Sequence, residues 1–436
     1  MRFRFVLLSV LIVYTAVVRA SSSTNGDYFI VTLKDGESIS RANGNYGTQT
    51  VRRIAGKNIF LVQAGSESDK TLKKMKKDKG VVTVERNERI SLTSAKLGNY
   101  TAYLLDNLGS YTAYLLDGAT RKNFYGTQVL WSYVDQPALK LIQVDQARTT
   151  TTGAGALVAY IDTGVDTEHP ALKPWLEPGV DLLRGESVSE LNGLSNYTAY
   201  LLDQYTAFLL DHRFSLSLSG IETQAFPPFF GHGTLVAGVI HVVAPGARIA
   251  PIKAFDASGN TTMFTVIEAV YRAADLGADV LNMSFSTPDD SETFATAIAF
   301  ARSTGMAIIA SAGNDSRDVE GLYPAAYPGV YAVAATDFAD RIAPFSNYGK
   351  SVSVTAPGAF VISTVPGGRY AATWGTSFSA PLVGGAVSLL VTGRQSQSSA
   401  ALVVNTADPI DSLNPGFERR LGRGRLNISQ ALKMKN

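Results

Sequence analysis

The chain contains no cysteine among its 436 residues, and it has only four histidines. The absence of cysteine excludes disulfide bonds, thiolate nucleophiles and cysteine-ligated zinc. The motif HExxH is also missing, so the sequence offers no such ligand pair for zinc-dependent hydrolysis. Charged residues make up 17% and apolar residues 45% of the chain, which is an ordinary globular balance. Any nucleophile or metal site must therefore be built without cysteine sulfur.

Long apolar runs are absent beyond the first twenty residues. The N-terminus, MRFRFVLLSVLIVYTAVVRA, has two early arginines, an apolar run over residues 5–18 and a small residue at its end, Ala20. This pattern predicts a secretory signal over residues 1–20, and hence a secreted, extracellular or periplasmic protein. The alternative is an uncleaved anchor helix, for which the run is short. We expect no stable membrane span after removal of the signal.

Charge is divided unevenly along the chain. Residues 21–96 carry 14 Lys/Arg against 8 Asp/Glu, whereas residues 97–436 carry 22 against 29. A basic first segment and an acidic remainder are suited to bind each other. The run KKMKKDKG (73–80) resembles a nucleic-acid-binding patch, but it is also typical of the solvated face of a helix. We favour the helix face and expect no nucleic-acid partner.

Local patterns predict two folded segments. The first, residues 27–91, is expected to be a small α+β domain, with strands in 28–36, 58–65 and 80–90 and a helix from Ser68. In the second, apolar strands alternate with helical patterns, which predicts an α/β fold with a doubly wound, mostly parallel sheet. The strands are expected in 155–164, 247–256, 279–286, 306–315 and 330–337, and the helices in 263–278 and 292–305.

The heptapeptide YTAYLLD recurs without a fixed period. Copies begin at Tyr100, Tyr111 and Tyr197, and the variant YTAFLLD begins at Tyr205. A solenoid needs a constant repeat length, so these copies are better explained as two local tandem duplications. They are apolar enough to form either a strand or a helix. We favour neutral loop insertions over a lid near the substrate or an insertion that disables the protein.

Three polar residues stand where strands end or helices begin. Asp162 closes an apolar strand in YIDTGVDTEHP, His232 opens a helix in GHGTLVAGVI, and Ser377 opens another in WGTSFSAPLVGG. Taken singly, each is better explained as a turn or helix-capping residue. Together they supply a nucleophile, a base and a group that orients the base, which is the set required for acyl transfer. Asn314, in SAGND, offers an amide donor for the oxyanion.

These motifs, with LNMSFS, FSNYG and TAPG, resemble those of the subtilisin-like serine proteases in their order along the chain. The resemblance covers residues 138–432, and residues 27–91 resemble that family's inhibitory propeptide more weakly. It implies that Asp162, His232 and Ser377 are catalytic and that Asn314 lies in the oxyanion hole. It also implies a substrate-binding set on two facing segments: Ser284, Phe285 and Ser286, and Ala310, Ser311, Ala312 and Gly313.

The chain departs from the family pattern at several positions. Leu235 replaces the usual histidine after GHGT, Trp374 replaces the usual serine before GTS, and Ser286 replaces a glycine. None of these changes removes a catalytic group, although Ser286 and Trp374 could alter substrate fit. The family often uses structural calcium, which the sequence does not locate. No cofactor is expected for catalysis.

The sequence is therefore interpreted as a secreted serine endopeptidase made as an autoinhibited precursor. The expected partners are protein or peptide substrates and the protein's own propeptide. A linker at 92–137 carries the first repeat pair, and the second pair forms an insertion at 194–211 between Asp162 and His232. The alternatives are a catalytically impaired binding protein of the same fold and an adhesion protein built on the repeats. The intact triad argues against the first, and the irregular repeat spacing argues against the second.

Overall fold

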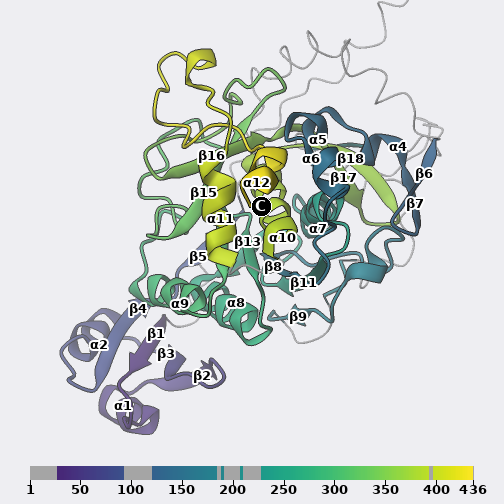
Figure 1. Cartoon of the computed structure of the whole chain (residues 1–436). Coiled ribbons are helices and arrows are strands. Elements are labelled where there is room, and N and C mark those ends of the chain that lie inside the picture. Colours follow the sequence, from purple (N-terminus) through teal and green to yellow (C-terminus); the bar gives the residue numbers. More distant parts are fainter. Residues whose placement is uncertain are drawn as a thin grey trace, which may run out of the picture. The chain divides into compact units, whose positions relative to one another are not determined.

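The computed structural model describes residues 27–92, 120–183, 188–190, 207–209, 227–391 and 396–435. The chain divides into two compact units, one ending at Arg86 and the other beginning at Asn87 (Figure 1). The predicted signal, the first repeat pair and most of the second pair lie outside the described residues.

Over its described residues, 27–86, the first unit is a four-stranded antiparallel sheet with two helices. Strand β1 lies between β3 and β4 and pairs with both, so that the order is β2-β3-β1-β4. Phe29, Val31, Val62 and Met75 form the centre of its apolar core. The elements are β1 (Tyr28–Leu33), α1 (Ile39–Tyr46), β2 (Gln49–Arg53), β3 (Ile59–Gln63), α2 (Ser68–Met75) and β4 (Val81–Arg86).

The second unit is built on a seven-stranded sheet in the order β16-β15-β14-β13-β8-β11-β9. Every neighbouring pair in it is parallel, which confirms the α/β prediction. Its central strands are buried on both faces, which explains why their sequences are continuous apolar runs. The strands are β8 (Leu157–Asp162), β9 (Val180–Asp181), β11 (Arg248–Lys253), β13 (Val280–Met283), β14 (Ala307–Ser311), β15 (Val330–Thr336) and β16 (Val352–Pro357).

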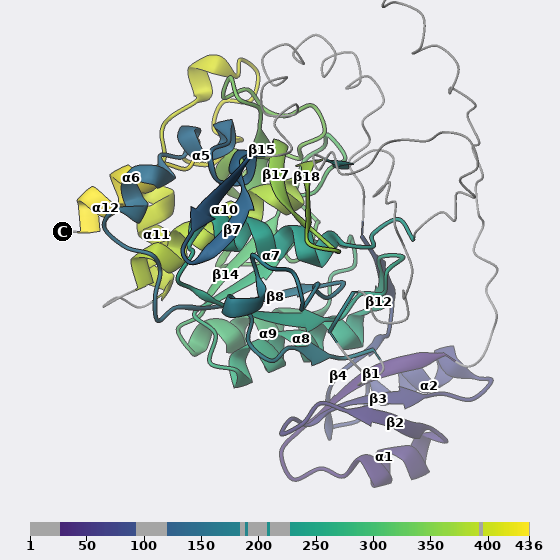
Figure 2. The same cartoon turned by 90° about the vertical axis from the view of Figure 1, so that its right-hand side faces the viewer.

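Helices cover both faces of this sheet. Figures 1 and 2 show α8 (Met263–Asp275) and α9 (Glu292–Ser303) on one side, and α7 (His232–Val243), α10 (Thr376–Val391) and α11 (Ser396–Asn405) on the other. Residues 376–390 of α10 are all buried, because the helix lies across the sheet and packs against α7. The described residues of this unit also form α4 (Trp131–Val134), α5 (Pro137–Leu141), α6 (Val144–Arg148), α12 (Ile428–Lys435) and the 3-10 turns Lys173–Trp175 and Asp411–Leu413.

The second repeat pair contributes a strand to a smaller antiparallel sheet. Strand β10 (Ala207–Leu209) lies within the copy that begins at Tyr205, and it pairs with β18 (Arg369–Trp374). Strand β18 also pairs with β17 (Ala359–Val365). The sequence left strand and helix open for the heptapeptide, and this part of one copy is a strand. A separate hairpin joins β6 (Arg121–Phe124) to β7 (Thr127–Leu130).

The prediction of one strand over residues 80–90 is wrong in one respect, because the pattern covers two strands. Strand β4 ends at Arg86, and β5 (Arg89–Ser91) pairs instead with β12 (Asn260–Thr262) in the second unit. The chain leaves the first sheet at Asn87 and Glu88. Their oxygen atoms accept hydrogen bonds from the backbone N–H groups of Phe264 and Met263, in the first turn of α8. These unsatisfied helix donors explain the break.

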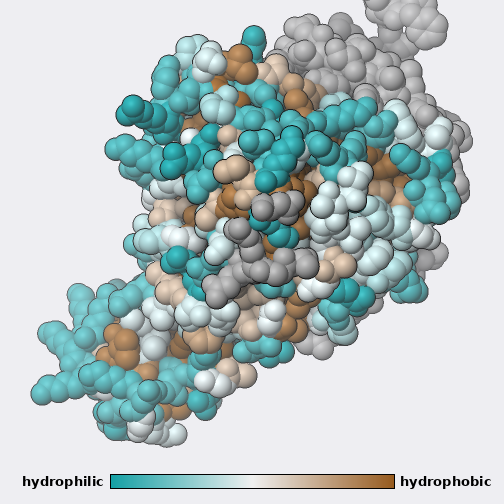
Figure 3. All heavy atoms as spheres, viewed as in Figure 1, coloured by the Kyte–Doolittle hydropathy of each residue, from teal (hydrophilic) through white to brown (hydrophobic). Residues whose placement is uncertain are grey.

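Figure 3 shows one face of the molecule. In Figure 3, hydrophilic and pale residues cover most of the described surface that faces the viewer, and hydrophobic residues form small separate groups. Within the described ranges, no single helix is long and apolar enough to cross a membrane. Helices α10 and α11 meet the length and composition test only as a pair, bent by 119°.

Candidate active site

The three predicted catalytic side chains come from one strand end and two helix starts. Asp162 is the last residue of β8, His232 is the first of α7, and Ser377 is the second of α10. Asp162 is 1% exposed and Ser377 is 7% exposed. Parallel strands place their carboxyl ends at one edge of a sheet, which is where such folds bind ligands. The structure therefore gathers residues 215 positions apart at this edge.

Asp162 is bonded directly to the imidazole of His232. The distance between Asp162 Oδ1 and His232 Nδ1 is 2.7 Å, and the backbone N–H of Thr163 donates to the same oxygen at 2.8 Å. The glycine after the histidine permits this approach. A Cβ on Gly233 would lie 2.1 Å from the carbonyl oxygen of Gly164, so only glycine lets α7 begin against the end of β8.

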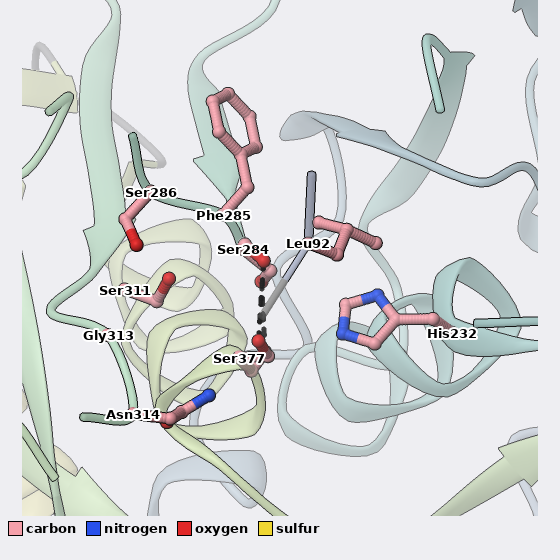
Figure 4. A pocket seen from close by; sticks show the side chains of 9 residues that line it. All are labelled: Leu92, His232, Ser284, Phe285, Ser286, Ser311, Gly313, Asn314 and Ser377. Carbon is pink, nitrogen blue, oxygen red and sulfur yellow. Dashed lines mark hydrogen bonds between the residues drawn. The ribbon is translucent and has the colours of Figure 1, made fainter. Parts of the chain in front are cut away.

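The imidazole also faces the serine across a narrow pocket (Figure 4). Its ring lies between Phe229 and Phe378, with centroid distances of 6.0 and 5.6 Å. Ser377 Oγ donates to the carbonyl oxygen of Ser284 at 3.3 Å, and Ser284 Oγ donates to the carbonyl oxygen of Ser377 at 2.9 Å. This reciprocal pair fixes the start of α10 against the segment that follows β13.

Asn314 is oriented by its neighbour in α10. Its side-chain oxygen accepts hydrogen bonds from both the backbone N–H and the hydroxyl of Thr376, each at 2.9 Å. The amide nitrogen is therefore the atom that points into the pocket, as Figure 4 shows. The backbone N–H of Ser377 is in the first turn of a helix, where N–H groups lack intrahelical acceptors. These two groups are suitably placed to act as oxyanion donors.

The predicted substrate-binding residues occupy different depths. Ser284, Phe285, Ser286, Ser311 and Gly313 all line the pocket (Figure 4). Ala310 and Ala312 are fully buried. None of the described residues that line the pocket is acidic. Trp374, the other departure expected to affect substrate fit, is 1% exposed and packs edge-on against Phe360 with 5.6 Å between ring centroids.

Sequence reasoning missed Leu92, whose side chain lines the same pocket (Figure 4). The preceding residues, in β5, run antiparallel to β12, and the Leu92 N–H donates to the carbonyl oxygen of Gly259 at 2.8 Å. The Ser91 hydroxyl adds a bond of 2.9 Å to the side-chain oxygen of Asn260. Strand β5 and Leu92 thus run beside β12, and the Leu92 side chain lines the same pocket as His232 and Ser377. No local pattern marks this, because β5 resembles any short strand.

The remaining described histidines are structural. His169 is buried, with Nε2 3.0 Å from the carbonyl oxygen of Arg369 and Nδ1 accepting from the N–H of Ala171. His241 is buried in α7 and stacks on Trp175. Their burial excludes a surface role for both. His212 lies outside the described residues.

A calcium site receives no support from the described residues. They contain no group of three or more His, Asp or Glu side chains arranged to hold a metal ion. We therefore assign no metal ligand and derive no chemical step through a metal.

The chain is similar to known proteins in sequence and in fold. The model of the subtilase family matches residues 153–424. The chain is 33% identical over 291 residues to the thermophilic serine proteinase of Bacillus sp. (strain AK1), a match that covers 66% of this chain and 64% of that protein. It is 31% identical over 303 residues to thermitase of Thermoactinomyces vulgaris, with 67% of this chain and 94% of thermitase covered. The match thus spans just under two thirds of the first relative's length.

The fold likeness covers nearly the whole chain. Fervidolysin from Fervidobacterium pennivorans, a keratinolytic enzyme related to subtilisin, matches with a TM-score of 0.69 at 23% identity. The match covers 94% of this chain and 61% of fervidolysin.

Proposed function

The chain belongs to the subtilase family of serine proteases, and from that premise we propose that it is a serine endopeptidase that cleaves proteins and peptides. The observation that carries this proposal is that His232, Ser377 and Asn314 line one pocket while Asp162 is hydrogen-bonded to His232. A nucleophile, a base, an orienting carboxylate and an oxyanion donor are thereby present together.

In the proposed mechanism, Ser377 Oγ attacks the scissile carbonyl carbon while His232 takes the hydroxyl proton. Asp162 holds His232 in one tautomer and stabilises the imidazolium that forms. The negative charge on the carbonyl oxygen is stabilised by the Asn314 side-chain amide and the Ser377 N–H. The imidazolium then protonates the leaving amine, and water hydrolyses the acyl-enzyme by the reverse sequence. Before attack, Ser377 Oγ must release its bond to the Ser284 carbonyl.

We propose further that the chain is made as an autoinhibited precursor. Residues 89–91 pair antiparallel with β12, and Leu92 lines the pocket that a substrate would have to enter. The bond after Leu92 is accordingly the proposed maturation cut, with Leu92 as the residue on its N-terminal side. The excess of positive charge in residues 21–96 over the acidic remainder would strengthen binding of residues 27–91 in trans.

The location of the protein is also part of this proposal. A signal over residues 1–20 would direct the chain across a membrane, and the absence of cysteine is compatible with an oxidising compartment. Secretion of the expressed full-length chain, with an N-terminus later than Ala20, would support it.

The catalytic assignment is tested by labelling the purified protein with a fluorophosphonate probe, which reacts with activated serines. Wild-type protein should be labelled and should hydrolyse a peptide substrate, whereas Ser377→Ala should do neither and should keep a native circular dichroism spectrum. A folded wild-type protein that is not labelled would contradict the proposal. It would favour the alternative, a catalytically impaired binding protein.

The precursor assignment is tested by N-terminal sequencing of the mature protein, which should begin at residue 93. The same cut should be absent in Ser377→Ala. A synthetic segment covering 27–92 should inhibit the mature enzyme, and the inhibition should weaken as salt screens surface charge. An inhibition constant that does not change with salt would show that the charge asymmetry plays no part.

A further inference from the structure

A buried carboxylate, Glu190, lies beside the candidate triad and is not used in the mechanism above. The residue is 8% exposed. Its Oε1 accepts a hydrogen bond of 2.5 Å from the Thr163 hydroxyl. Its Oε2 accepts bonds from the backbone N–H of Thr234, at 3.2 Å, and from the Thr234 hydroxyl. Three donors thus converge on one buried carboxylate.

The partners of Glu190 adjoin the catalytic residues. Thr163 directly follows Asp162, and its Oγ1 lies 3.3 Å from Asp162 Oδ1. The same Oγ1 accepts a bond of 3.0 Å from the N–H of Gly233, the residue after His232. Thr234 is the third residue of α7. Glu190 therefore connects the end of β8, which carries Asp162, to the start of α7, which carries His232.

The backbone holds Glu190 in this position. Its N–H donates to the carbonyl oxygen of Val165, and the N–H of Val165 donates to the carbonyl oxygen of Val188, both at 2.9 Å. Ser189, which lies between Val188 and Glu190 in the chain, forms an isolated β-bridge with Val165. Because the main chain of residues 188–190 is bonded to Val165, the carboxylate is anchored beside the end of β8.

Charged or titratable groups lie on the segments next to this carboxylate. Asp162 is the nearest acidic neighbour through Thr163, and burial together with this charge raises the pKa of Glu190. Burial, together with the negative charges of Glu190 and Asp162, raises the pKa of the Tyr160 phenol in β8. Lys253, in β11, is paired with Asp181 at 3.9 Å. Asp166 accepts bonds from the N–H groups of Glu168 and Gly367.

We propose that Glu190 is a positioning residue that sets the placement of Asp162 relative to His232 and adds negative charge beside this pair. The inference rests on the proposed function. A hydrogen-bonded link of this kind matters because a small displacement of a catalytic pair can reduce the rate about 100-fold. A nearby negative charge also favours the protonated form of His232, which the reaction transiently requires.

The first test replaces Glu190 by glutamine in the full chain. One side-chain oxygen becomes an NH₂ group, which cannot accept the bonds from Thr234 or Thr163, and the charge is lost. We expect kcat to fall by about 10- to 100-fold with KM little changed. The acid limb of the kcat/KM profile should move to lower pH, because the imidazolium loses a stabilising neighbour. A merely structural defect would not move this limb.

Glu177→Gln is the matched control. Glu177 lies in the same connection between Asp162 and His232, but its partner is Arg248, at 2.6 Å. The chemical change is identical, so kcat and the acid limb should remain those of the wild type. If the acid limb moved in both variants, the overall charge of the protein would explain the effect, and the proposal would be overturned.

Thr163 provides a second test if Glu190→Gln fails to fold. Thr163→Ser keeps the hydroxyl that donates to Glu190 and should retain kcat and the pH profile. Thr163→Val removes the hydroxyl at nearly the same volume and should lower kcat while leaving KM. Equal activity in these two variants, or a folded Glu190→Gln enzyme with wild-type kcat and pH profile, would overturn the inference. Fluorophosphonate labelling distinguishes failure of this inference from failure of the proposed function. A folded wild-type protein that is not labelled refutes the proposed function itself.

Discussion

Replacing His241 by phenylalanine should make folding of the second unit less sensitive to acid. The imidazole stacks on Trp175 at 5.7 Å and lies edge-on to Phe124 at 5.5 Å between ring centroids. Neither ring nitrogen has a hydrogen-bond partner among the described residues. Burial, with the guanidinium of Arg148 and the imidazole of His169, lowers the pKa of His241 to about 3.

The direction of the effect follows from proton binding. Above pH 6.5 the ring is neutral in both the folded and the unfolded chain, so its contribution to the free energy of unfolding does not change with pH. As the pH falls below 6.5, the unfolded chain binds a proton and the folded chain does not until about pH 3. The folded state therefore loses about 1.4 kcal/mol per pH unit in this window. Between pH 6.5 and 4.5 the loss is about 3 kcal/mol, a large part of a typical stability.

The assay is urea unfolding from pH 7 to pH 4.5, followed by tryptophan fluorescence. Both proteins carry Ser377→Ala, so that self-digestion does not interfere. The free energy of unfolding should fall less steeply with pH in the His241→Phe protein, by about 3 kcal/mol over the interval. His169, whose pKa burial also lowers, contributes equally to both proteins. Parallel curves for the two proteins would refute the assignment of acid sensitivity to His241.

Three further outcomes are expected. Asn314→Ala should lower kcat by roughly 100- to 1000-fold, as for other oxyanion donors; an effect confined to KM, measured by steady-state kinetics, would make Asn314 a binding residue only. The residue before the cleaved bond should be apolar and not basic, because the described pocket lining has no acidic side chain; a peptide library dominated by arginine there would contradict this. Deleting residues 196–211 should leave folding and short-peptide hydrolysis within a few-fold, since loop length changes closure entropy little; loss of folding would show that β10 is a structural strand.

The catalytic elements are predictable because their signals are local. Apolar runs that end in Asp162 or in the segment before Asn314 identify buried parallel strands, since both faces of such strands are covered. Glycines beside His232 and Ser377 identify helix starts. These patterns depend only on neighbours along the chain, and a sequence displays them directly. The class of fold and the candidate triad are therefore predictable from the sequence alone.

Other features depended on contacts between distant segments, which only the tertiary structure could decide. The strand predicted over residues 80–90 breaks because Asn87 bonds to Phe264, 177 residues away. Glu190 meets Thr234, 44 residues along the chain, only after β8 and α7 pack together. A short apolar strand and an isolated glutamate carry no local mark of such partners. Buried polar groups in folded proteins are hydrogen-bonded, and the tertiary fold determines which donor or acceptor lies close enough to each of them.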